Sequence, residues 1–299
     1  MERDYRAAAR VFKALCDPKR LAILEELRGG EKCACVLQEP MELTQSGLSY
    51  HMKVLCESGL VESRQEGKWT HYQLSRTGRE YAVKLLLEAD DIYLLCHQYP
   101  DGDTLGSAAA LYLGLRQKGK RVSIRCGDPI PQKYDYMFEG IEFPDFEPQF
   151  ICAVDIADPQ LLGQRLSPYA QRVDLCIDHH GSNTKYARQY VIRPEAASTT
   201  EIMYDLLFTM EAEITSQIAD CIYTGITTDT GCFRYTNATS RTYIVAAHMM
   251  DKGADAAMIN RVMFDTKSRA RLEIERRVLD TMSFYFGGKC AVAYVTREM

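Results

Sequence analysis

The sequence predicts a mixed α/β protein in which a small winged helix-turn-helix domain precedes a mostly parallel α/β domain. Three observations predict this fold class: helical spacing followed by a hairpin signal in the first 84 residues, short apolar runs alternating with helices after residue 91, and a length of 299 residues, enough for roughly two domains. We expect domains at 1–84 and 85–265, and a linker helix and strand at 266–299.

Composition places the chain among folded globular proteins. Hydrophobic residues make up 46% and charged residues 26%, which argues against disordered, collagen-like and coiled-coil classes. No run reaches the roughly 20 apolar residues of a membrane span, and the charged first residues do not fit a secretory signal. We therefore expect a cytoplasmic protein with no membrane partner, in which most of the 11 cysteines are reduced.

Helical spacing appears first at 5–15 and 18–27. Asp17 is a candidate N-cap of the second helix, and Pro18 stands in the first turn, where proline is tolerated. A third, short helix is expected near 32–38.

The next segment, 43–60, predicts a helix, a turn and a second helix. Thr44 is the expected cap, Gly47 and Leu48 the expected turn, and 49–58 the second helix. Residues 60–75 then alternate apolar and polar side chains around a Glu-Gly pair, which predicts a β-hairpin. Any three-helix bundle with a hairpin would give a similar pattern.

The residue identities in this region are more specific than their spacing. ALCDPKRLAILEEL and SGLSYHMKVLCESGLVESRQEGKWTHYQLS closely resemble the DNA-binding region of ArsR/SmtB-type repressors, over most of residues 5–84. The resemblance implies binding of double-stranded DNA, with one helix in a major groove and the hairpin on flanking phosphates. The implied DNA-facing residues are Gln45, Ser46, Ser49, Tyr50, His51 and Lys53 on the helix, and Arg64 and Lys68 on the hairpin.

Cys33 and Cys35 fall where some members of that family carry a C-x-C metal-sensing motif. A thiolate pair suits a soft metal but needs a third or fourth donor. Gln38 stands where arsenic sensors often place a third cysteine, and Cys16 or Cys56 would serve only if the fold brings them near. The alternative is that both are ordinary small residues of a helix.

From residue 91 the pattern is that of a mostly parallel sheet, whose strand ends form the usual ligand edge. The expected strands are 91–97, 121–127, 150–158 and 172–180, and the expected helices are 104–119 and those near 197–210, 215–225, 240–252 and 256–284.

Carboxylates and imidazoles gather at these strand ends and in one later loop. They are His97, Asp101, Asp103, Asp155, Asp178, His179, His180 and Asp229. Such a set fits two divalent cations, and mixed nitrogen and oxygen ligands favour Mn²⁺ or a similar ion over thiolate-loving metals. A lone Asp-Gly-Asp is usually a turn and a lone His-His pair is more often structural, but the whole set on four separate ends is not expected by chance.

The segments HQYPDGDTLGS, AVDIAD, IDHHGSN and GITTDTGCFRY resemble, in order and spacing, the four motifs of the DHH phosphoesterase family. They look most like its bifunctional oligoribonuclease and pAp phosphatase branch, over about residues 85–299. The resemblance implies a metal-dependent enzyme that hydrolyses phosphate esters of short RNA or of 3′-phosphoadenosine 5′-phosphate (pAp), by attack of a metal-bound hydroxide.

Residue roles follow from the same resemblance. His97, Asp101 and Asp155 would hold a first metal ion, and Asp103, Asp155, His179 and Asp229 a second. His180 would act on the scissile phosphate and Asp178 would support the histidines; both are our candidate catalytic residues. Weaker candidates for substrate contacts are Ser198, Thr199 and Arg234, each of which could equally be a helix cap or a surface charge.

The chain departs from the family near its last residues. No G-G-G-H stretch of the substrate-gripping C-terminal domain is present, and GGKCAVAYVTREM resembles only the first strand of that domain. We therefore expect a truncated C-terminal domain and an exposed edge strand; the alternative is a degenerate domain kept for sensing.

Two functions remain open from the sequence. The first is a phosphoesterase fused to a DNA-binding regulator; the alternative is an ArsR-type regulator whose DHH half binds a nucleotide as effector without turnover. The segment 75–91 would serve both domains as one shared helix. The repressor family implies a homodimer, but this helix often builds that dimer, so the oligomeric state stays open.

Overall fold

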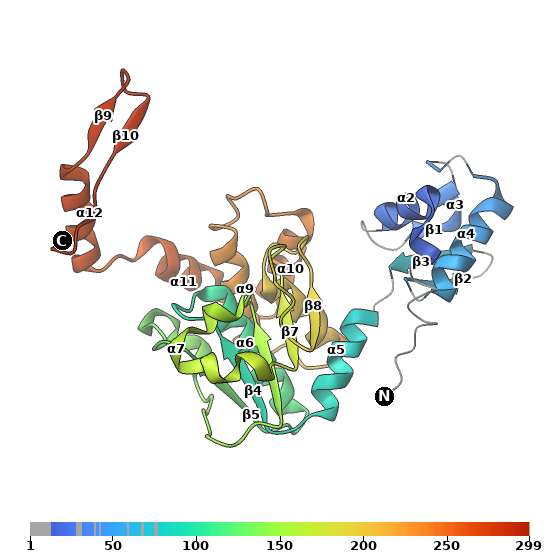
Figure 1. Ribbon diagram of the computed structural model, residues 1–299, viewed down its shortest axis with the longest axis horizontal. Helices are drawn as coiled ribbons and strands as arrows, with labels where there is room; N and C mark the ends of the chain where they lie inside the picture. Colours follow the sequence, from blue (N-terminus) through green and yellow to red (C-terminus); the bar gives the residue numbers. More distant parts are fainter. Residues whose placement is uncertain are drawn as a thin grey trace. The chain divides into compact units, whose positions relative to one another are not determined.

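A computed structural model describes residues 13–27, 32–38, 40–41, 43–58, 60–66, 69–74 and 77–298, which form two compact units, Met1–Glu88 and Ala89–Met299 (Figure 1). The helix predicted at 5–15 lies outside the described residues except for its last three, which are helical. No helix in these ranges is both long and apolar enough to cross a bilayer.

The first unit has the predicted winged helix-turn-helix arrangement. Its strands form an antiparallel sheet in the order β1-β3-β2, and its hairpin pairs Glu66 with Trp69 across the turn. The elements are α2 (Pro18–Leu27), β1 (Lys32–Cys33), α3 (Ala34–Gln38), α4 (Gln45–Glu57), β2 (Val61–Glu66), β3 (Trp69–Leu74) and α5 (Thr77–Glu88).

Local chemistry explains where α2 begins and what it packs against. The Asp17 carboxylate accepts the amide N–H groups of Lys19 and Arg20 at 2.9 and 3.1 Å, which confirms the predicted cap. The apolar faces of the helices and the start of β2 meet in one core. Its buried members are Ala14, Ile23, Leu27, Leu37, Leu48, Met52, Leu55 and Val61.

One prediction for this unit is wrong, and the bounds of one short helix differ. Gly47 and Leu48 do not form a turn, because α4 runs without a break from Gln45 to Glu57. The hydroxyl of Thr44 caps this helix and accepts the amide N–H of Gly47 at 3.1 Å, so the glycine belongs to the first helical turn. The segment 32–38 is helical only from Ala34, since Lys32 and Cys33 pair with β3.

The second unit is built on a five-stranded sheet in which every pairing is parallel. The strand order is β5-β4-β6-β7-β8, and the bounds are β4 (Ile92–Cys96), β5 (Val122–Cys126), β6 (Phe150–Val154), β7 (Leu175–Asp178) and β8 (Gln189–Ile192). β8 was not predicted, because it is a four-residue edge strand whose first two residues are exposed and give no apolar run.

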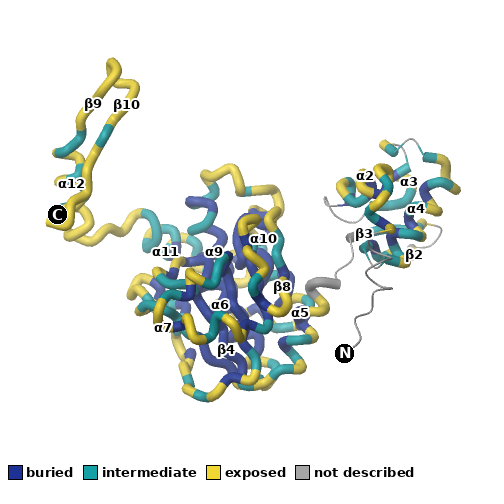
Figure 2. Tube along the Cα trace, in the orientation of Figure 1, coloured by how far each residue is buried: buried dark blue, intermediate teal, exposed yellow. Residues whose placement is uncertain are grey.

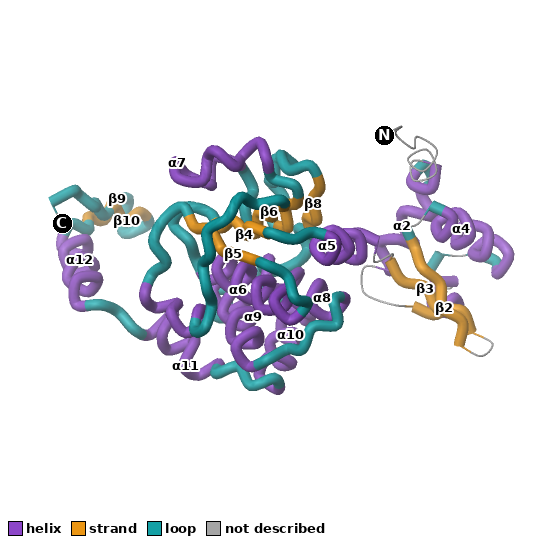
Figure 3. Tube along the Cα trace, turned by 90° about the horizontal axis from the view of Figure 1, so that it is seen from below, coloured by secondary structure: helices purple, strands orange, loops and turns teal. Residues whose placement is uncertain are grey.

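Helices cover both faces of this sheet (Figure 3). One face carries α6 (Gly102–Gln117), α8 (Thr199–Thr209), α9 (Ser216–Asp229) and α10 (Ser240–Asp251); the other carries α7 (Gly163–Leu166). On the α7 face the core contains Tyr93, Leu95, Ile151, Leu162 and Leu166. The short 3₁₀ helices are Gln132–Phe138, Pro159–Leu162 and Ser167–Arg172.

The long helix predicted at 256–284 is wrong. The structure has α11 (Ala256–Asn260), a π-helical turn (Arg261–Asp265), α12 (Arg269–Asp280) and a hairpin of β9 (Ser283–Tyr285) and β10 (Cys290–Val292). The amide of Thr266 returns to the carbonyl of Arg261 and the residue becomes extended, after which Ser268 caps a new helix. Most of α12 and the hairpin is exposed (Figure 2).

Strand order determines where a ligand site can form. The chain leaves β4 through α6 to β5 on one side, and β6 then pairs with the opposite side of β4, so the β4–β6 boundary is a topological switch point. Crevices at the carboxyl ends of strands on either side of such a point are the usual ligand sites of open α/β sheets. His97 and Asp155 follow these two strands directly.

Two glycines bring helices very close together beside this edge. A Cβ atom on Gly106 of α6 would lie 2.4 Å from the carbonyl oxygen of Cys221 on α9. A Cβ atom on Gly225 of α9 would lie 2.3 Å from the side chain of Thr200 and 2.7 Å from the Asp103 carboxylate. Contacts this short are not compatible with a larger residue, so both positions need glycine.

We expect Gly106→Ala to destabilise the protein. The overpacking cost is about 1–3 kcal/mol, with the clash against rigid backbone at the upper end, and it exceeds the ~1 kcal/mol that alanine gains over glycine in a helix. Thermal unfolding followed by circular dichroism measures the effect. The matched control is Gly181→Ala, whose new Cβ would meet nothing closer than Pro194 at 3.7 Å. Equal melting of the two variants would contradict the close-packing explanation.

Candidate metal centre

The loop after β4 supplies the first candidate ligands. His97 directly follows the strand, and its Nε2 lies 3.6 Å from Asp101 Oδ1 and 3.7 Å from Asp155 Oδ2. Asp101 caps α6 by accepting the amides of Asp103 and Thr104 at 3.0 and 3.1 Å. The ring nitrogen Nδ1 of His97 faces the carbonyl oxygen of Gln98 at 2.7 Å, an arrangement that directs Nε2 toward the carboxylates.

Asp155 follows β6 and lies at the centre of the cluster. Its side chain is 3% exposed and its φ of 59° is left-handed, a region where aspartate is tolerated better than most residues. The Asp155 amide donates to the carbonyl of Ile177 on β7 at 2.9 Å, and the hydroxyl of Thr199 donates to Oδ1 at 2.9 Å. These contacts fix the carboxylate between the ends of β4 and β7.

β7 ends at Asp178, and His179 and His180 follow it directly. Nδ1 of His179 lies 3.2 Å from the carbonyl oxygen of Ala196, while its Nε2 is buried and has no hydrogen-bond partner among the described residues. That Nε2 lies 3.1 Å from Asp229 Oδ2 and 3.7 Å from Asp155 Oδ1. A buried imidazole nitrogen that faces carboxylates and lacks a partner has the chemistry of a metal ligand.

Asp103 and Asp229 complete the cluster from α6 and α9. The side chain of Asp103 is fully buried, and its two oxygens accept the amides of Thr199 and Thr200 at 2.6 and 2.9 Å, at the first turn of α8. Asp229 is the last residue of α9, and its carbonyl accepts a hydrogen bond from Asn237 at 3.2 Å.

Three groups of side chains present ligand atoms within 4.8 Å of one another. They are His97 with Asp101 and Asp155, Asp103 with His179 and Asp229, and Asp155 with His179 and His180. The first group contains the residues of one predicted ligand set, and the second contains the other predicted set without Asp155. In the third, Nδ1 of His180 is already hydrogen-bonded to Asp178 at 2.8 Å, which disfavours His180 as a ligand through that atom.

The electrostatics of the cluster favour cations. Burial and the carboxylates of Asp155 and Asp229 raise the pKa of Asp103 well above its usual value. Burial lowers the pKa of His97, but Asp101 and Asp155 outweigh it and raise that pKa to about 11. In the part of the chain that the structure describes, no lysine or arginine pairs with the carboxylates of the cluster, so divalent ions would supply the missing positive charge.

Comparison with known protein families matches residues 91–226 to the DHH family, N-terminal domain, and residues 17–63 to the bacterial regulatory protein, arsR family. The chain joins an ArsR-type regulatory domain to a DHH-family domain. Both resemblances predicted from the sequence are thereby confirmed.

Individual relatives agree with this assignment. The bifunctional oligoribonuclease and PAP phosphatase NrnA of Thermus thermophilus is 32% identical over 69% of this chain and 64% of its own length. The arsenical resistance operon repressor of Bacillus subtilis is 48% identical over 21% of this chain and 62% of its own length. A solved exopolyphosphatase-related protein from Bacteroides fragilis has a TM-score of 0.68 at 27% identity, covering 75% of this chain and 71% of that one. The chain thus spans less than two thirds of the two curated relatives.

Asp178, the first residue of the DHH motif, lies where it supports His180. Its buried carboxylate accepts hydrogen bonds from the amide of His180 at 3.2 Å and from Asn183 Nδ2 at 2.6 Å, and it faces His180 Nδ1. These bonds outweigh burial and lower the pKa of Asp178, and the same carboxylate raises the pKa of His180. His180 is 45% exposed, so its ring reaches solvent beside the cluster.

The three weaker substrate candidates have other contacts. The Ser198 hydroxyl caps α8 and accepts the amide of Glu201 at 3.3 Å. Thr199 contacts Asp155 and Asp103 of the cluster itself. Arg234 is exposed and donates to the carbonyl of Gly231 at 2.6 Å.

Sequence reasoning missed two residues that hold the ligands. Asn183 fixes Asp178, and the HHGSN segment did contain it, although no role was predicted. Asn237 joins the carbonyls of Ala197 and Asp229 at 3.1 and 3.2 Å. Nothing in the local sequence marks Asn237, because its partners come from other elements.

In the ArsR-type domain, α4 presents most of the predicted DNA-facing residues on one exposed face. Gln45, Ser46, Ser49, Tyr50 and Lys53 are exposed, opposite the buried Leu48, Met52 and Leu55. His51 is largely covered instead, with a 13% exposed side chain whose Nδ1 lies 3.8 Å from Asp17. Arg64 is exposed on β2, and Lys68 lies outside the described residues.

Cys33 and Cys35 lie close together at the start of α3, with their sulfur atoms 2.7 Å apart. The hydrogen bond from Cys35 lowers the pKa of the Cys33 thiol. Within the described ranges, no third histidine, cysteine or acidic side chain completes a metal-binding group with them. The thiol-sensor hypothesis therefore stays a prediction.

Substitution of single candidate ligands in the DHH domain tests which of them belong to more than one ligand group. Asp155 belongs to two of the three groups and Asp229 to one. We expect Asp155→Asn to weaken the binding of divalent ions, probed with Mn²⁺, at least tenfold at each group that contains Asp155, and Asp229→Asn to weaken it only at its own group. Calorimetric titration with Mn²⁺ gives the stoichiometry and affinity. Asp251→Asn, at an exposed acid that ends α10, is the control; equal behaviour of all three variants would contradict the shared role of Asp155.

Proposed function

We propose that the DHH domain is a divalent-metal-dependent phosphoesterase that hydrolyses short oligoribonucleotides or pAp. The observation that supports this most is the overlap of ligand groups around Asp155, which joins the His97–Asp101 side of the cluster to His179. Two adjacent divalent ions are the usual catalysts of in-line displacement at phosphorus. The T. thermophilus relative, described as an oligoribonuclease and PAP phosphatase, supports the substrate class.

The ligands divide between the two proposed ions as the geometry suggests. His97 and Asp101 hold one ion, Asp103, His179 and Asp229 hold the other, and Asp155 is shared. When bound, two such ions, most simply Mn²⁺, lower the pKa of water to near neutrality and offset charge on the phosphoryl oxygens. The amides of α8 and the Thr199 hydroxyl keep Asp103 and Asp155 in place, so the ligands are oriented before any ion arrives.

His180 is the residue that we propose for proton transfer to the leaving oxygen. The Asp178 carboxylate accepts a hydrogen bond from Nδ1 of His180, which leaves Nε2 of this exposed ring to face the substrate. The raised pKa of His180 favours its protonated form, the form that donates a proton. Asp178 and Asn183 act as positioning residues, because Asp178 contacts His180 and Asn183 in turn contacts Asp178.

For the ArsR-type domain we propose binding of double-stranded DNA through the exposed face of α4, with Arg64 on flanking phosphate. Small polar side chains on one face of a recognition helix suit base edges in a major groove, while lysine and arginine contact phosphates. A homodimer would present two such helices, as the predicted resemblance implies.

Metal-dependent release of nucleotide is the direct test of the enzyme. We expect release of product from a dinucleotide and from pAp with Mn²⁺, and none with a chelator. His180→Ala should lower kcat by roughly 10²–10⁴ while Mn²⁺ binding persists, because general acid catalysis contributes about that much. Asp155→Ala should abolish release.

The outcome that contradicts this proposal is release that Asp155→Ala leaves unchanged. A folded, metal-loaded protein that releases nothing, and whose DNA affinity changes with added nucleotide, would instead favour the regulator with a nucleotide effector.

DNA binding is tested separately by gel shift on a duplex selected from a random pool. Lys53→Ala should weaken binding to all sequences and reduce the salt dependence by about one counterion, as expected for a phosphate contact. Tyr50→Ala should relax sequence preference instead. Lys84→Ala, which removes an exposed lysine of α5 at 3.7 Å from Glu88, is the control. A Lys84→Ala effect as large as that of Lys53→Ala would contradict the assignment of the α4 face.

A further inference from the structure

Tyr99 is an unusual residue in the metal-ligand loop. It lies two residues after His97 and two before Asp101, so its Cα is within about 7 Å of both along the chain. Its φ is +53°, in the left-handed region, and it precedes Pro100. A bulky L-residue is rarely left-handed, and a following proline further restricts the backbone, so this conformation is strained.

Hydrogen bonds to neighbouring segments hold the loop in this conformation. The amide of Tyr99 donates to Asp128 Oδ2 at 2.8 Å, just after β5, and the amide of Gln98 donates to the carbonyl of Leu161 at 2.7 Å. Both contacts involve the backbone. The loop is thus anchored on two sides while the Tyr99 side chain takes no part in the anchoring.

The ring itself is left in solvent. Tyr99 is 79% exposed, whereas its neighbours Gln98 and Pro100 are half-buried and buried. Among the described residues its ring makes no aromatic or cation–π contact, and its hydroxyl has no hydrogen-bond partner. Packing therefore does not account for an aromatic residue at this strained position.

We propose that Tyr99 is a specificity-determining residue that stacks on a nucleobase of the substrate while the phosphate lies at the metal centre. This inference rests on the proposed function, and it adds which part of the substrate the protein recognises. An exposed aromatic ring is a platform for any base, because every base has a π-face. A phosphate ester without a base gains nothing from the ring, so Tyr99 would separate nucleotides from base-free substrates such as the polyphosphate suggested by the name of the B. fragilis relative.

The test compares two substrates that differ only in their bases: 5′-phosphorylated diadenosine and the same dinucleotide with abasic sites. For Tyr99→Ala we expect kcat/KM to fall about 5- to 150-fold on the first and to stay within twofold on the second, the loss expected for one stacked base. Tyr99→Phe should behave like the wild type, because it keeps the ring. Tyr99→Gly removes the ring and relieves the left-handed strain, so it covers the case in which Tyr99→Ala distorts the loop.

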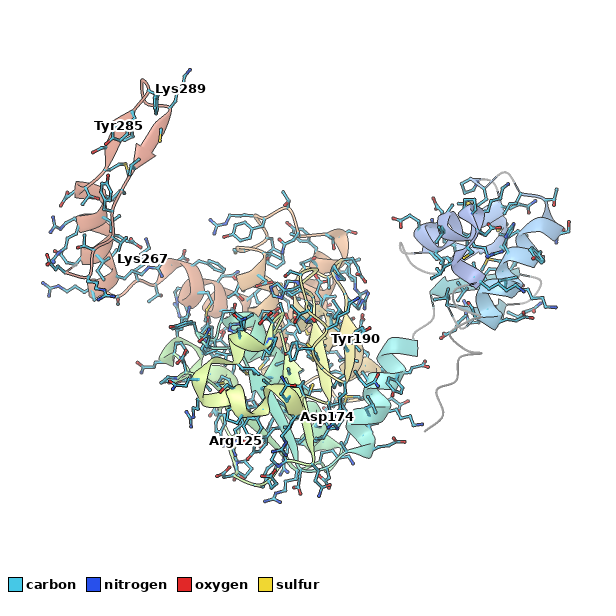
Figure 4. All side chains as sticks on the ribbon, in the orientation of Figure 1. Arg125, Asp174, Tyr190, Lys267, Tyr285 and Lys289 are labelled. Atoms are coloured by element: carbon cyan, nitrogen blue, oxygen red, sulfur yellow. The ribbon has the colours of Figure 1, made fainter. Side chains whose placement is uncertain are left out.

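A matched control is Tyr190→Ala, which removes another exposed tyrosine of the same unit. Tyr190 lies on β8, on the opposite side of the unit from Arg125 of β5, as Figure 4 shows, whereas Tyr99 is held by Asp128 beside β5. We expect Tyr190→Ala to match the wild type on both substrates. A second readout is fluorescence: a bound 2-aminopurine dinucleotide should be quenched by the wild type and Tyr99→Phe but not by Tyr99→Gly.

Two results would overturn the inference: equal loss on both substrates for Tyr99→Gly, which would indicate a purely structural loop residue, or no loss on either. If the wild type hydrolyses neither substrate with Mn²⁺, the proposed function fails first; the fluorescence comparison then decides separately whether Tyr99 stacks on a base.

Discussion

The position of one buried carboxylate, that of Asp155, constrains the rest of the α/β unit. A charge that is 3% exposed is costly unless it is paired, and here its neighbours are imidazoles and further carboxylates rather than lysine or arginine. The fold therefore has to bring the ends of β4, β6 and β7 and the first turn of α8 to one point. Parallel pairing, the switch in strand order and the glycine contacts between α6 and α9 all serve that convergence.

The sequence predicts correctly those helices and strands whose own residues show the typical pattern, such as an apolar run or a cap. β4 is buried along its whole length, and its apolar run places it correctly to within a residue at each end. The candidate metal ligands are also visible without a structure, since they are carboxylates and histidines at strand ends, and the structure brings their side chains together. α2 was placed at 18–27 because Asp17 and Pro18 mark its start.

The remaining features depend on hydrogen bonds that the pattern of residue types does not reveal. Gly47 looks like a turn residue in isolation, but Thr44 caps the helix before it and makes a continuous α4 the better solution. Thr266 carries no breaker signal, yet it ends the π-helical turn that separates α11 from α12. Asn183 and Asn237 owe their roles to partners on other elements, which periodicity does not reveal. Thr199 is predicted as a substrate contact for the same reason, because its bond to Asp155 joins two segments that are far apart in the sequence.

The spread of the ligands along the chain has a consequence for the order of folding. His97 is the first of them and Asp229 the last, and between them the chain forms β5, β6, β7 and β8. Contacts between residues so far apart in sequence form late, after loop closure has brought the strands together. A growing polypeptide therefore has no complete ion site until α9 has been synthesised and packed. Partly folded chains would therefore lack the complete set of candidate ligands.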